Sequence, residues 1–380
     1  MKILLDARGA SWYNGTGIGT YTYNLIKSMV NIDYNTNNKF HLLCSGEKEE
    51  AFDNHNTKIL MTSRKNPTFF EDHYIPLYGN KESIDLYHVP QNGIGLNKNG
   101  DFLKIVTIHD LIPYVLPETV GKAYLRNFLR DMPSILNEAD GILTVSEYSK
   151  KDILKFFPSF PSERIIVTPL AADKSFKPLN KLRCKKKVKN RFNIRNPFIL
   201  YIGGFSLRKN VKLLIDSFND AFTSLNDEFD LVICGSLMDE GLKLKEYANK
   251  LQAKKHIIFT GFIEDEFLPT LYNACELFVY PSLYEGFGLP PLEAISCQTP
   301  VLTTNTTSIP EVIKNPYLLI EPNNKLELES KLVKLLNDAE LRETLGKQGL
   351  KNSKSFNWDK TAKNTLDAYD LFYKLGKKDK

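Results

Sequence analysis

The sequence predicts an α/β protein built of two doubly wound domains, each with a parallel sheet between layers of helices. Three observations carry this prediction. The chain has 380 residues, which is more than a single hydrophobic core usually serves. Short apolar runs alternate with amphipathic stretches, a pattern typical of parallel sheets covered on both faces. The alternation stops and restarts once, near residues 174–196, where we place the boundary between the domains.

Residues 1–174 are expected to form the first domain. Apolar runs of strand length predict buried strands at 2–7, 39–44, 85–89, 104–110, 141–145 and 164–169. Between them, residues 16–31 and 119–139 space their apolar side chains as helices do. This order of elements predicts a Rossmann-like domain.

A basic segment follows the first domain. Residues 177–191 hold eight Lys or Arg and no Asp or Glu, and we predict an interdomain linker at 175–196. A solvated linker or helix face is one interpretation of these charges, and contact with anionic lipid or an acidic partner is the other.

Residues 197–357 repeat the strand–helix pattern and are expected to form a second Rossmann-like domain. Its strands are expected at 198–204, 229–235, 256–262, 277–282, 299–304 and 317–322. Two such domains facing one another would leave a cleft lined by the carboxyl ends of both sheets. Residues 358–380 have helical spacing and are expected to form a C-terminal helix that packs across the domains, crossing back to the first.

Composition narrows the function classes. The five cysteines are scattered and form no CxxC pair, which argues for a reduced, cytoplasm-like compartment and against a zinc site. No apolar run approaches the length that spans a bilayer. The net charge of +5 becomes −3 when the eight basic residues of 177–191 are set aside, which disfavours a nucleic-acid partner.

The stretch "SLYEGFGLPPLEA", residues 282–294, places Glu285 and Glu293 eight positions apart. Gly286 and Gly288 suit a loop, and the Pro–Pro pair after them suits the first turn of a helix. The two carboxylates could serve one acid–base reaction or hold two parts of one ligand. Glu293 could equally be an ordinary first-turn glutamate, stabilised by the helix dipole. The free N–H groups of such a helix start also favour a diphosphate.

Arg208 and Lys209 follow a strand that ends at Gly203 and Gly204, and they precede a helix. A guanidinium and an ammonium group at that place suit a pyrophosphate, although a solvated pair is the simpler interpretation of these two residues alone.

In the first half, Gly17, Ile18 and Gly19 are expected in a loop ahead of a helix, and His109 is expected at the end of a strand. The glycines make an imperfect dinucleotide fingerprint. A lone histidine there is commonly structural. Ser146 and Ser149 in "TVSEYSK" suit the cap of the next helix.

Residues 280–312 resemble the E-x7-E signature of the retaining glycosyltransferases of family GT4, which have the GT-B fold. "GGFSLRKNVKLLIDSF" at 203–218 and "HDL" at 109–111 resemble further motifs of that family. The resemblance spans essentially the whole chain. The chain departs from the family at Leu170, where an Asn is frequent.

The resemblance implies roles for particular residues. Glu285 would contact the transferred sugar of a nucleotide-sugar, Glu293 the ribose, and His109 the sugar near its reacting carbon. The predicted catalytic residues are His109, Glu285, Arg208 and Lys209. The predicted donor-binding residues are Gly17, Ile18, Gly19, Gly204, Arg208, Lys209, Glu285, Gly286, Phe287, Gly288, Leu289 and Glu293.

The resulting hypothesis is a retaining hexosyltransferase that needs no metal and no cofactor beyond its donor. GDP-mannose is favoured as donor, and a UDP- or dTDP-sugar is the alternative. The expected acceptor is a saccharide or lipid-linked saccharide in surface polysaccharide or glycoconjugate synthesis. The expected location is the cytoplasm, with peripheral contact at the inner face of the membrane. A nucleotide-sugar epimerase of the same fold and a non-catalytic nucleotide-sugar-binding protein are the rival hypotheses, with a nicotinamide oxidoreductase behind them.

Overall fold

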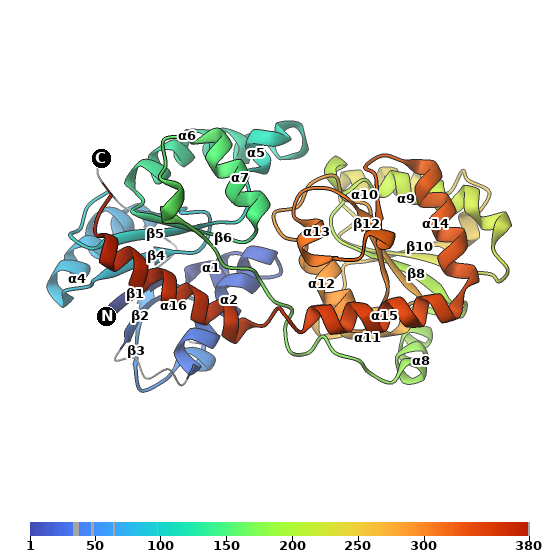
Figure 1. Ribbon diagram of the computed structural model, residues 1–380, viewed down its shortest axis with the longest axis horizontal. Coiled ribbons are helices and arrows are strands. Elements are labelled where there is room, and N and C mark those ends of the chain that lie inside the picture. Colours follow the sequence, from blue (N-terminus) through green and yellow to red (C-terminus); the bar gives the residue numbers. More distant parts are fainter. Residues whose placement is uncertain (33–37, 47–48, 64, 97, 379–380) are drawn as a thin grey trace. The chain divides into compact units, whose positions relative to one another are not determined.

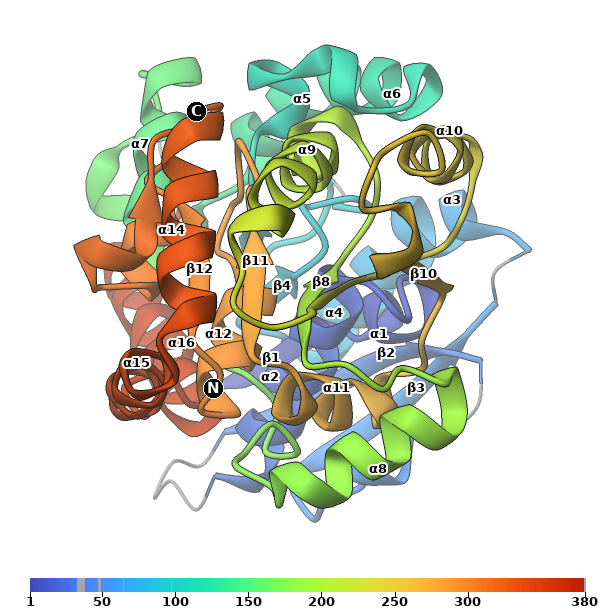
Figure 2. The same cartoon turned by 90° about the vertical axis from the view of Figure 1, so that its right-hand side faces the viewer.

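The computed structural model describes residues 1–32, 38–46, 49–63, 65–96 and 98–378. The chain forms two compact units, and each has its own parallel sheet with helices on both faces (Figures 1 and 2). The first unit consists of Met1–Ala171 and Phe356–Lys380, and the second consists of Ala172–Ser355. The first unit is therefore discontinuous in sequence.

In the described part of the first unit, seven strands pair in the order β3-β2-β1-β4-β5-β6-β7, and all neighbours are parallel. The strands are β1 (Lys2–Asp6), β2 (Lys39–Ser45), β3 (Thr57–Thr62), β4 (Leu86–Val89), β5 (Leu103–Ile108), β6 (Gly141–Thr144) and β7 (Ile165–Val167). Its helices are α1 (Arg8–Trp12), α2 (Gly17–Asn31), α3 (Pro67–Phe69), α4 (Ile75–Glu82), α5 (Ile112–Val115), α6 (Lys122–Glu138), α7 (Glu147–Phe156) and α16 (Trp358–Leu375). All six strands predicted in this half form, and β3 is an additional one.

Helix α16 completes the first unit, in agreement with the prediction that the C-terminal helix crosses back to the first domain. Phe372 is fully buried against Gly141 of β6, where a Cβ would lie 2.8 Å from the ring. The Tyr369 hydroxyl shares a 2.6 Å hydrogen bond with His88 Nδ1 of β4. The helix ends at Leu375, so the predicted end at 380 is too late. Positions 379 and 380 of the predicted segment lie outside the described residues. Leu371 of this helix is 38% exposed.

The sheet of the second unit has six described strands in the order β10-β9-β8-β11-β12-β13, again with parallel neighbours. The strands are β8 (Phe198–Ile202), β9 (Asp230–Cys234), β10 (Ile257–Gly261), β11 (Leu277–Tyr280), β12 (Val301–Thr304) and β13 (Leu319–Ile320). Its helices are α8 (Lys181–Phe192), α9 (Val211–Ala221), α10 (Asp239–Ala248), α11 (Leu268–Ala274), α12 (Leu289–Ser296), α13 (Ile309–Val312), α14 (Lys325–Asn337) and α15 (Ala339–Ser353). The six strands predicted in this half all form.

The prediction of a linker at 175–196 is wrong. Most of this segment is helix α8, which belongs to the second unit and packs against α11. Asn180 caps α8 by accepting a 2.9 Å hydrogen bond from the N–H of Arg183. The helix buries Cys184 and Val188. Lys and Arg are good helix formers, and a cap and a buried stripe are enough to order them despite their charge.

The order of strands fixes where loops meet in the second unit. Strand β8 has β9 on one side and β11 on the other, so the connections leave β8 and β11 in opposite directions. Open α/β sheets bind ligands beyond the carboxyl ends of the strands at such a switch point. The loops after Ile202 and Tyr280 therefore meet at this point, and they carry most of the predicted site residues.

Candidate functional site

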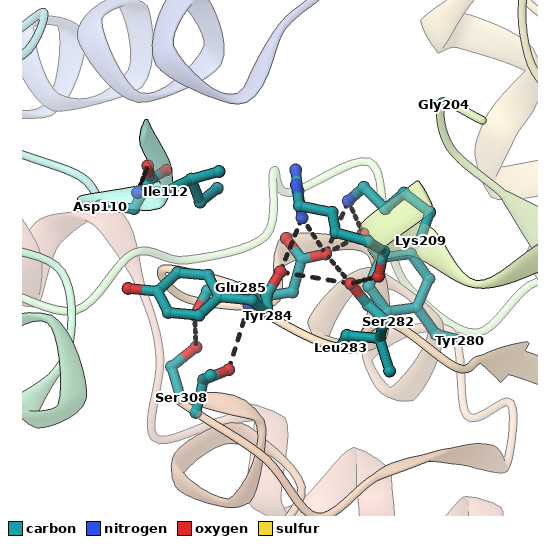
Figure 3. Close-up of polar contacts among 12 residues, drawn as sticks. Asp110, Ile112, Gly204, Lys209, Tyr280, Ser282, Leu283, Tyr284, Glu285 and Ser308 are labelled. Atoms are coloured by element: carbon teal, nitrogen blue, oxygen red, sulfur yellow. Dashed lines mark hydrogen bonds and ion pairs between the residues drawn. The ribbon is translucent and has the colours of Figure 1, made fainter. Parts of the chain in front are cut away.

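Glu285 lies in the loop between β11 and α12 and is the centre of a hydrogen-bonded cluster. Its Oε1 accepts hydrogen bonds from Arg208 Nη1 at 2.8 Å and from Lys209 Nζ at 2.7 Å. The same oxygen accepts from the hydroxyls of Tyr280 at 3.1 Å and Ser282 at 2.5 Å. Figure 3 shows Lys209, Tyr280 and Ser282 converging on this carboxylate.

Backbone contacts join the two loops that carry the cluster. The carbonyl of Arg208 accepts a 2.7 Å hydrogen bond from the N–H of Leu283, and Arg208 Nη1 donates to the carbonyl of Tyr284 at 2.7 Å. Ser308 Oγ donates to the carbonyl of Glu285 at 2.8 Å. The positions of the charged groups are therefore fixed by main-chain contacts as well as by their own attraction.

The charges of the cluster keep Glu285 ionised. This residue is only 8% exposed. Burial alone would raise the pKa of Glu285, but the positive charges of Lys209 and Arg208 outweigh it and hold the pKa at about 2. In these contacts two cations face one carboxylate, and two cations side by side suit an anionic ligand.

Glu293 has a different environment. It lies in α12, and its Oε2 accepts a 2.9 Å hydrogen bond from the hydroxyl of Tyr272. Burial raises the pKa of Glu293 to about 8, and the negative charges of Asp265 and Asp173 act in the same direction. The hydrogen bonds given for Glu285 and Glu293 have no partner in common. This arrangement argues against one acid–base pair and favours contacts with two parts of a ligand.

Gly288 connects the two carboxylates. It precedes α12 with a φ of 103°, in the left-handed region that favours glycine. The Pro–Pro pair occupies the first turn of the helix, as expected, and Glu293 lies one turn inside it. Gly204, also predicted to bind donor, lies after β8, and its carbonyl accepts a 2.7 Å hydrogen bond from the Tyr201 hydroxyl.

Gly17, Ile18 and Gly19 lie in the first unit, and the expectation that they form a loop is wrong. They are the first turn of α2, where Thr16 Oγ1 accepts a 3.3 Å hydrogen bond from the N–H of Gly19. A Cβ on Gly19 would lie 2.1 Å from the carbonyl oxygen of Tyr13. The turn is helical because Thr16 caps it, and glycine is needed at 19 for this close approach.

His109 follows β5 and is 7% exposed. Its Nε2 lies 2.9 Å from the carbonyl of Pro90, which places the proton on Nε2 and leaves Nδ1 as an acceptor. Burial lowers the pKa of His109 to about 4, although the contact with Pro90 opposes the shift. The ring is therefore neutral at pH 7. The next residue, Asp110, accepts through Oδ1 a 3.1 Å hydrogen bond from the N–H of Ile112, the first residue of α5 (Figure 3).

The structure brings together Arg208, Lys209 and Glu285, and it places Glu293 on the helix that follows. The roles proposed for these residues stay predictions. Sequence reasoning missed Tyr280 and Tyr272. Tyr280 ends a strand two residues before the quoted motif, so strand alternation offered a signal for it. Tyr272 lies far from Glu293 in sequence, and no local pattern pointed to it.

Two general properties bear on the site. Within the described residues, no group of three His, Cys, Asp or Glu side chains is arranged to hold a metal ion. In the same part of the chain, every helix is too short or too polar to cross a membrane. Ser146 caps α7 by accepting a 3.0 Å hydrogen bond from the N–H of Ser149, as expected.

Both halves of the chain match families of glycosyltransferases. Residues 15–176 match the family "Glycosyltransferase Family 4", and residues 183–352 match "Glycosyl transferases group 1". The O-antigen chain mannosyltransferase B of Escherichia coli is 33% identical over 267 residues, which are 70% of this chain and 70% of that one.

Solved structures share the fold at low identity. Sucrose-phosphate synthase from Thermosynechococcus elongatus matches with a TM-score of 0.74 and 20% identity over 99% of this chain and all of the other. Anabaena HepE in complex with UDP and glucose matches with a TM-score of 0.75 and 16% identity, over 98% of this chain and 100% of that one. These likenesses establish the GT-B architecture.

Proposed function

The chain belongs to glycosyltransferase family 4 and transfers a glycosyl group to a saccharide acceptor, and on this premise we propose a retaining, metal-independent mannosyltransferase. The donor in this proposal is a nucleotide-sugar, with GDP-mannose favoured and a UDP- or dTDP-sugar as the alternative. Mannose is supported by the mannosyltransferase of Escherichia coli, which is 33% identical. The acceptor is a saccharide or a lipid-linked saccharide of a surface polysaccharide.

The observation that carries the proposal is the cluster around Glu285. Arg208 and Lys209 both donate to its Oε1, at the sheet edge where open α/β proteins bind nucleotides. A guanidinium and an ammonium group fixed by the protein stabilise charge that develops on a leaving diphosphate, an effect worth several kcal/mol in many enzymes (roughly 3–4 kcal/mol). These cations take the part that Mg²⁺ plays elsewhere.

In the proposed reaction, the bond between the anomeric carbon and the β-phosphate oxygen breaks, and its electron pair stays on the phosphate. The acceptor hydroxyl oxygen attacks the same face of the sugar and forms the new glycosidic bond. Its proton passes to the leaving phosphate oxygen. Glu285 orients the sugar hydroxyls, Glu293 accepts hydrogen bonds from the ribose, and His109 accepts one from the sugar through Nδ1.

We place this activity in the cytoplasm. The five cysteines are buried and free, which suits a reducing compartment. A lipid-linked acceptor would bring the enzyme to the cytoplasmic face of a membrane.

A donor screen tests the proposal. GDP-mannose, UDP-glucose, UDP-GlcNAc and dTDP-rhamnose are each offered with mannoside acceptors, and release of the nucleoside diphosphate is measured with and without EDTA. We expect release from GDP-mannose, undiminished by EDTA, and an α-linked product by NMR. If none of the donors binds and none releases a nucleoside diphosphate, the proposal is refuted. Loss of activity in EDTA would refute only metal independence.

The same screen separates the rival functions. An epimerase would convert the nucleotide-sugar in the absence of any acceptor. A binding protein would retain the donor without releasing diphosphate. Arg208→Gln is the matched variant, because it removes one cation of the cluster, and it should lower release in the transferase alone.

A further inference from the structure

Helix α8 has an inner and an outer face. The inner face buries Cys184 and Val188. Beside them, Lys181 Nζ lies 2.9 Å and Lys185 Nζ 2.7 Å from the carboxylate of Glu276. Arg191, near the end of the helix, pairs with Glu264. Three of the helix's cations are thus paired within the second unit, and the buried side chains and these pairs fix which face of α8 looks outward.

The outer face of α8 is formed by Arg183, Lys186, Lys187 and Lys189, all of them exposed. At about 100° per residue Arg183, Lys186 and Lys189 lie on the arc opposite the buried stripe, and Lys187 lies at the edge of that arc. Among the residues that the structure describes, no carboxylate lies within ion-pair distance of any of the four. Figures 1 and 2 show α8 along the outside of its unit. The outer face therefore presents four charges of one sign.

A pocket of about 440 Å³ borders this face. Its charged lining residues are Lys185, Lys186, Lys189 and Arg195, and its described lining contains no acidic side chain. The volume and the charge suit a phosphate group together with part of the molecule that carries it.

Leu182 distinguishes among anionic partners. It projects from the same face with 79% of its surface exposed, and Leu179 before the helix is 40% exposed. An exposed leucine among cations gains nothing from a nucleic-acid backbone. At a bilayer surface it enters the acyl boundary while the cations remain among the headgroup phosphates.

We propose that the outer face of α8 docks the protein on an anionic lipid bilayer, with lipid phosphates in the pocket beside Lys186 and Leu182 in the interface. The proposal rests on the charge and exposure of this helix and is independent of the donor and acceptor proposed above. Clusters of four or more Lys or Arg bind anionic leaflets in this way, with a strong dependence on salt.

The test is co-sedimentation of the full-length protein with vesicles of phosphatidylcholine, with and without phosphatidylglycerol, at low and high salt. We expect binding to the anionic vesicles that salt weakens, and none to the neutral ones. The variant Arg183→Gln/Lys186→Gln/Lys187→Gln/Lys189→Gln should bind at least about tenfold more weakly. Leu182→Gln should weaken binding about threefold or more, since it removes the apolar contact.

The control removes the same charge elsewhere in the second unit, at the exposed lysines 245, 250, 254 and 255 on and after α10. This variant should bind vesicles within about twofold of the wild type. No binding by the wild type, or equal loss in both quadruple variants, would overturn the proposal. Tighter binding to single-stranded RNA than to vesicles, lost in the α8 variant, would overturn it in favour of nucleic acid.

Diphosphate release with a soluble acceptor separates this proposal from the proposed function. The α8 variant should retain that activity in the absence of vesicles. A protein that transfers sugar and ignores vesicles would refute the docking face alone. One that binds vesicles and turns over no donor would refute the function alone.

Discussion

Glu285 and Glu293 are the same residue type in one short motif, yet the structure gives them opposite proton affinities. Burial acts on both. Lys209 and Arg208 counter it at Glu285 and hold the pKa at about 2. At Glu293 burial raises the pKa to about 8, because the opposing hydrogen bond from the Tyr272 hydroxyl does not offset it. At neutral pH one carboxylate is ionised and the other is mostly protonated, so the two are suited to different tasks.

The first prediction separates these tasks. Glu285→Gln should lower the turnover number by about 10²–10³ without weakening nucleoside diphosphate binding, because the lost carboxylate orients the sugar and its removal leaves the two cations more positive toward the diphosphate. Glu293→Gln should weaken nucleoside diphosphate binding by roughly tenfold and lower turnover less, because it removes a hydrogen bond to the ribose. Steady-state kinetics and calorimetry measure both effects.

Glu343→Gln is the control for this comparison. Glu343 is exposed on α15 and pairs only with Lys347 at 2.6 Å in the contacts described, so its loss should change neither quantity. Equal effects on turnover and binding at both 285 and 293 would contradict the division of roles.

The second prediction concerns pH. Ionised Glu293 is the better acceptor for ribose hydroxyls, and its ionised fraction rises as the pH passes through the pKa of about 8. Affinity for the nucleoside diphosphate should therefore increase about tenfold between about pH 7 and 9 and then level off. Calorimetry in buffers of different ionisation enthalpy should show proton release on binding. Glu293→Gln should be flat over this range, and a wild type that binds more weakly as pH rises would refute the assignment.

At the scale of elements, the contact between α16 and the first sheet is polar at its centre. His88 of β4 is fully buried, and both ring nitrogens have partners: Thr107 Oγ1 of β5 at 2.8 Å and the Tyr369 hydroxyl of α16 at 2.6 Å. Burial lowers the pKa of His88 to about 3, and the nearby His109 adds to the shift. The neutral ring joins two strands and a helix.

The third prediction follows from this contact. A histidine whose folded pKa is depressed stabilises the protein above its unfolded pKa of about 6.5, and that stability is lost as pH falls toward the folded value. Between about pH 7 and 5, His88 should reduce the free energy of unfolding by about 2 kcal/mol. Urea unfolding of the wild type and of His88→Gln at both pH values measures this effect. The quantity compared is the change in the free energy of unfolding between the two pH values, so a constant loss of stability in the variant does not matter. An equally steep loss in the variant would contradict it.

How much of each element the sequence could predict depends on whether local pattern decides it. Strands β1 and β5 are apolar runs buried on both faces, and their order with the helices predicted the α/β class. Strand β3 was not predicted because its apolar run, Ile59–Met61 in "TKILMT", is only three residues long, and the strand is only partly buried. Helix α8 was predicted as a linker because the eight basic residues of 177–191 outweighed two helix signals, the cap at Asn180 and the apolar pair Cys184 and Val188.

The candidate site was predictable where its residues are close in sequence. The spacing of Glu285, Gly288 and Glu293 gave the loop and helix start correctly. The contacts of Glu285 with Arg208 and Lys209 join residues 76 or more positions apart, and only the order of β8 and β11 in the sheet brings them together. Gly17–Gly19 form a helical turn and not the predicted loop, and the local signal for this is one residue, the Thr16 cap of α2.

At the scale of the whole molecule, the first unit is made of two stretches of chain, and α16 supplies part of its core. Trp358, Leu366, Tyr369 and Phe372 of this helix are all at most 4% exposed. Thr361 Oγ1 also donates to the carbonyl of Pro169 at 2.6 Å. The first unit is therefore incomplete without the helix, whereas the second has its own continuous core.

The fourth prediction is that deletion of residues 356–380 unfolds the first unit alone. The deletion exposes the apolar surface that α16 covers and leaves His88 without Tyr369. Differential scanning calorimetry should show loss of one transition and retention of the transition of the second unit. Deletion of residues 377–380 is the control and should keep both transitions. Two intact transitions in the longer deletion would show that α16 is dispensable.

The discontinuity of the first unit has a consequence for biosynthesis. During translation, residues 172–355 are made before α16. Synthesis of these residues takes roughly 10–40 s at ordinary elongation rates. The second unit is therefore expected to fold on the ribosome while the first is still unfinished, the reverse of the usual vectorial order. Force-sensing arrest peptides placed along the nascent chain should register the later half first. Until α16 emerges, the apolar surface of the first unit that this helix covers is exposed to chaperones and to misassembly.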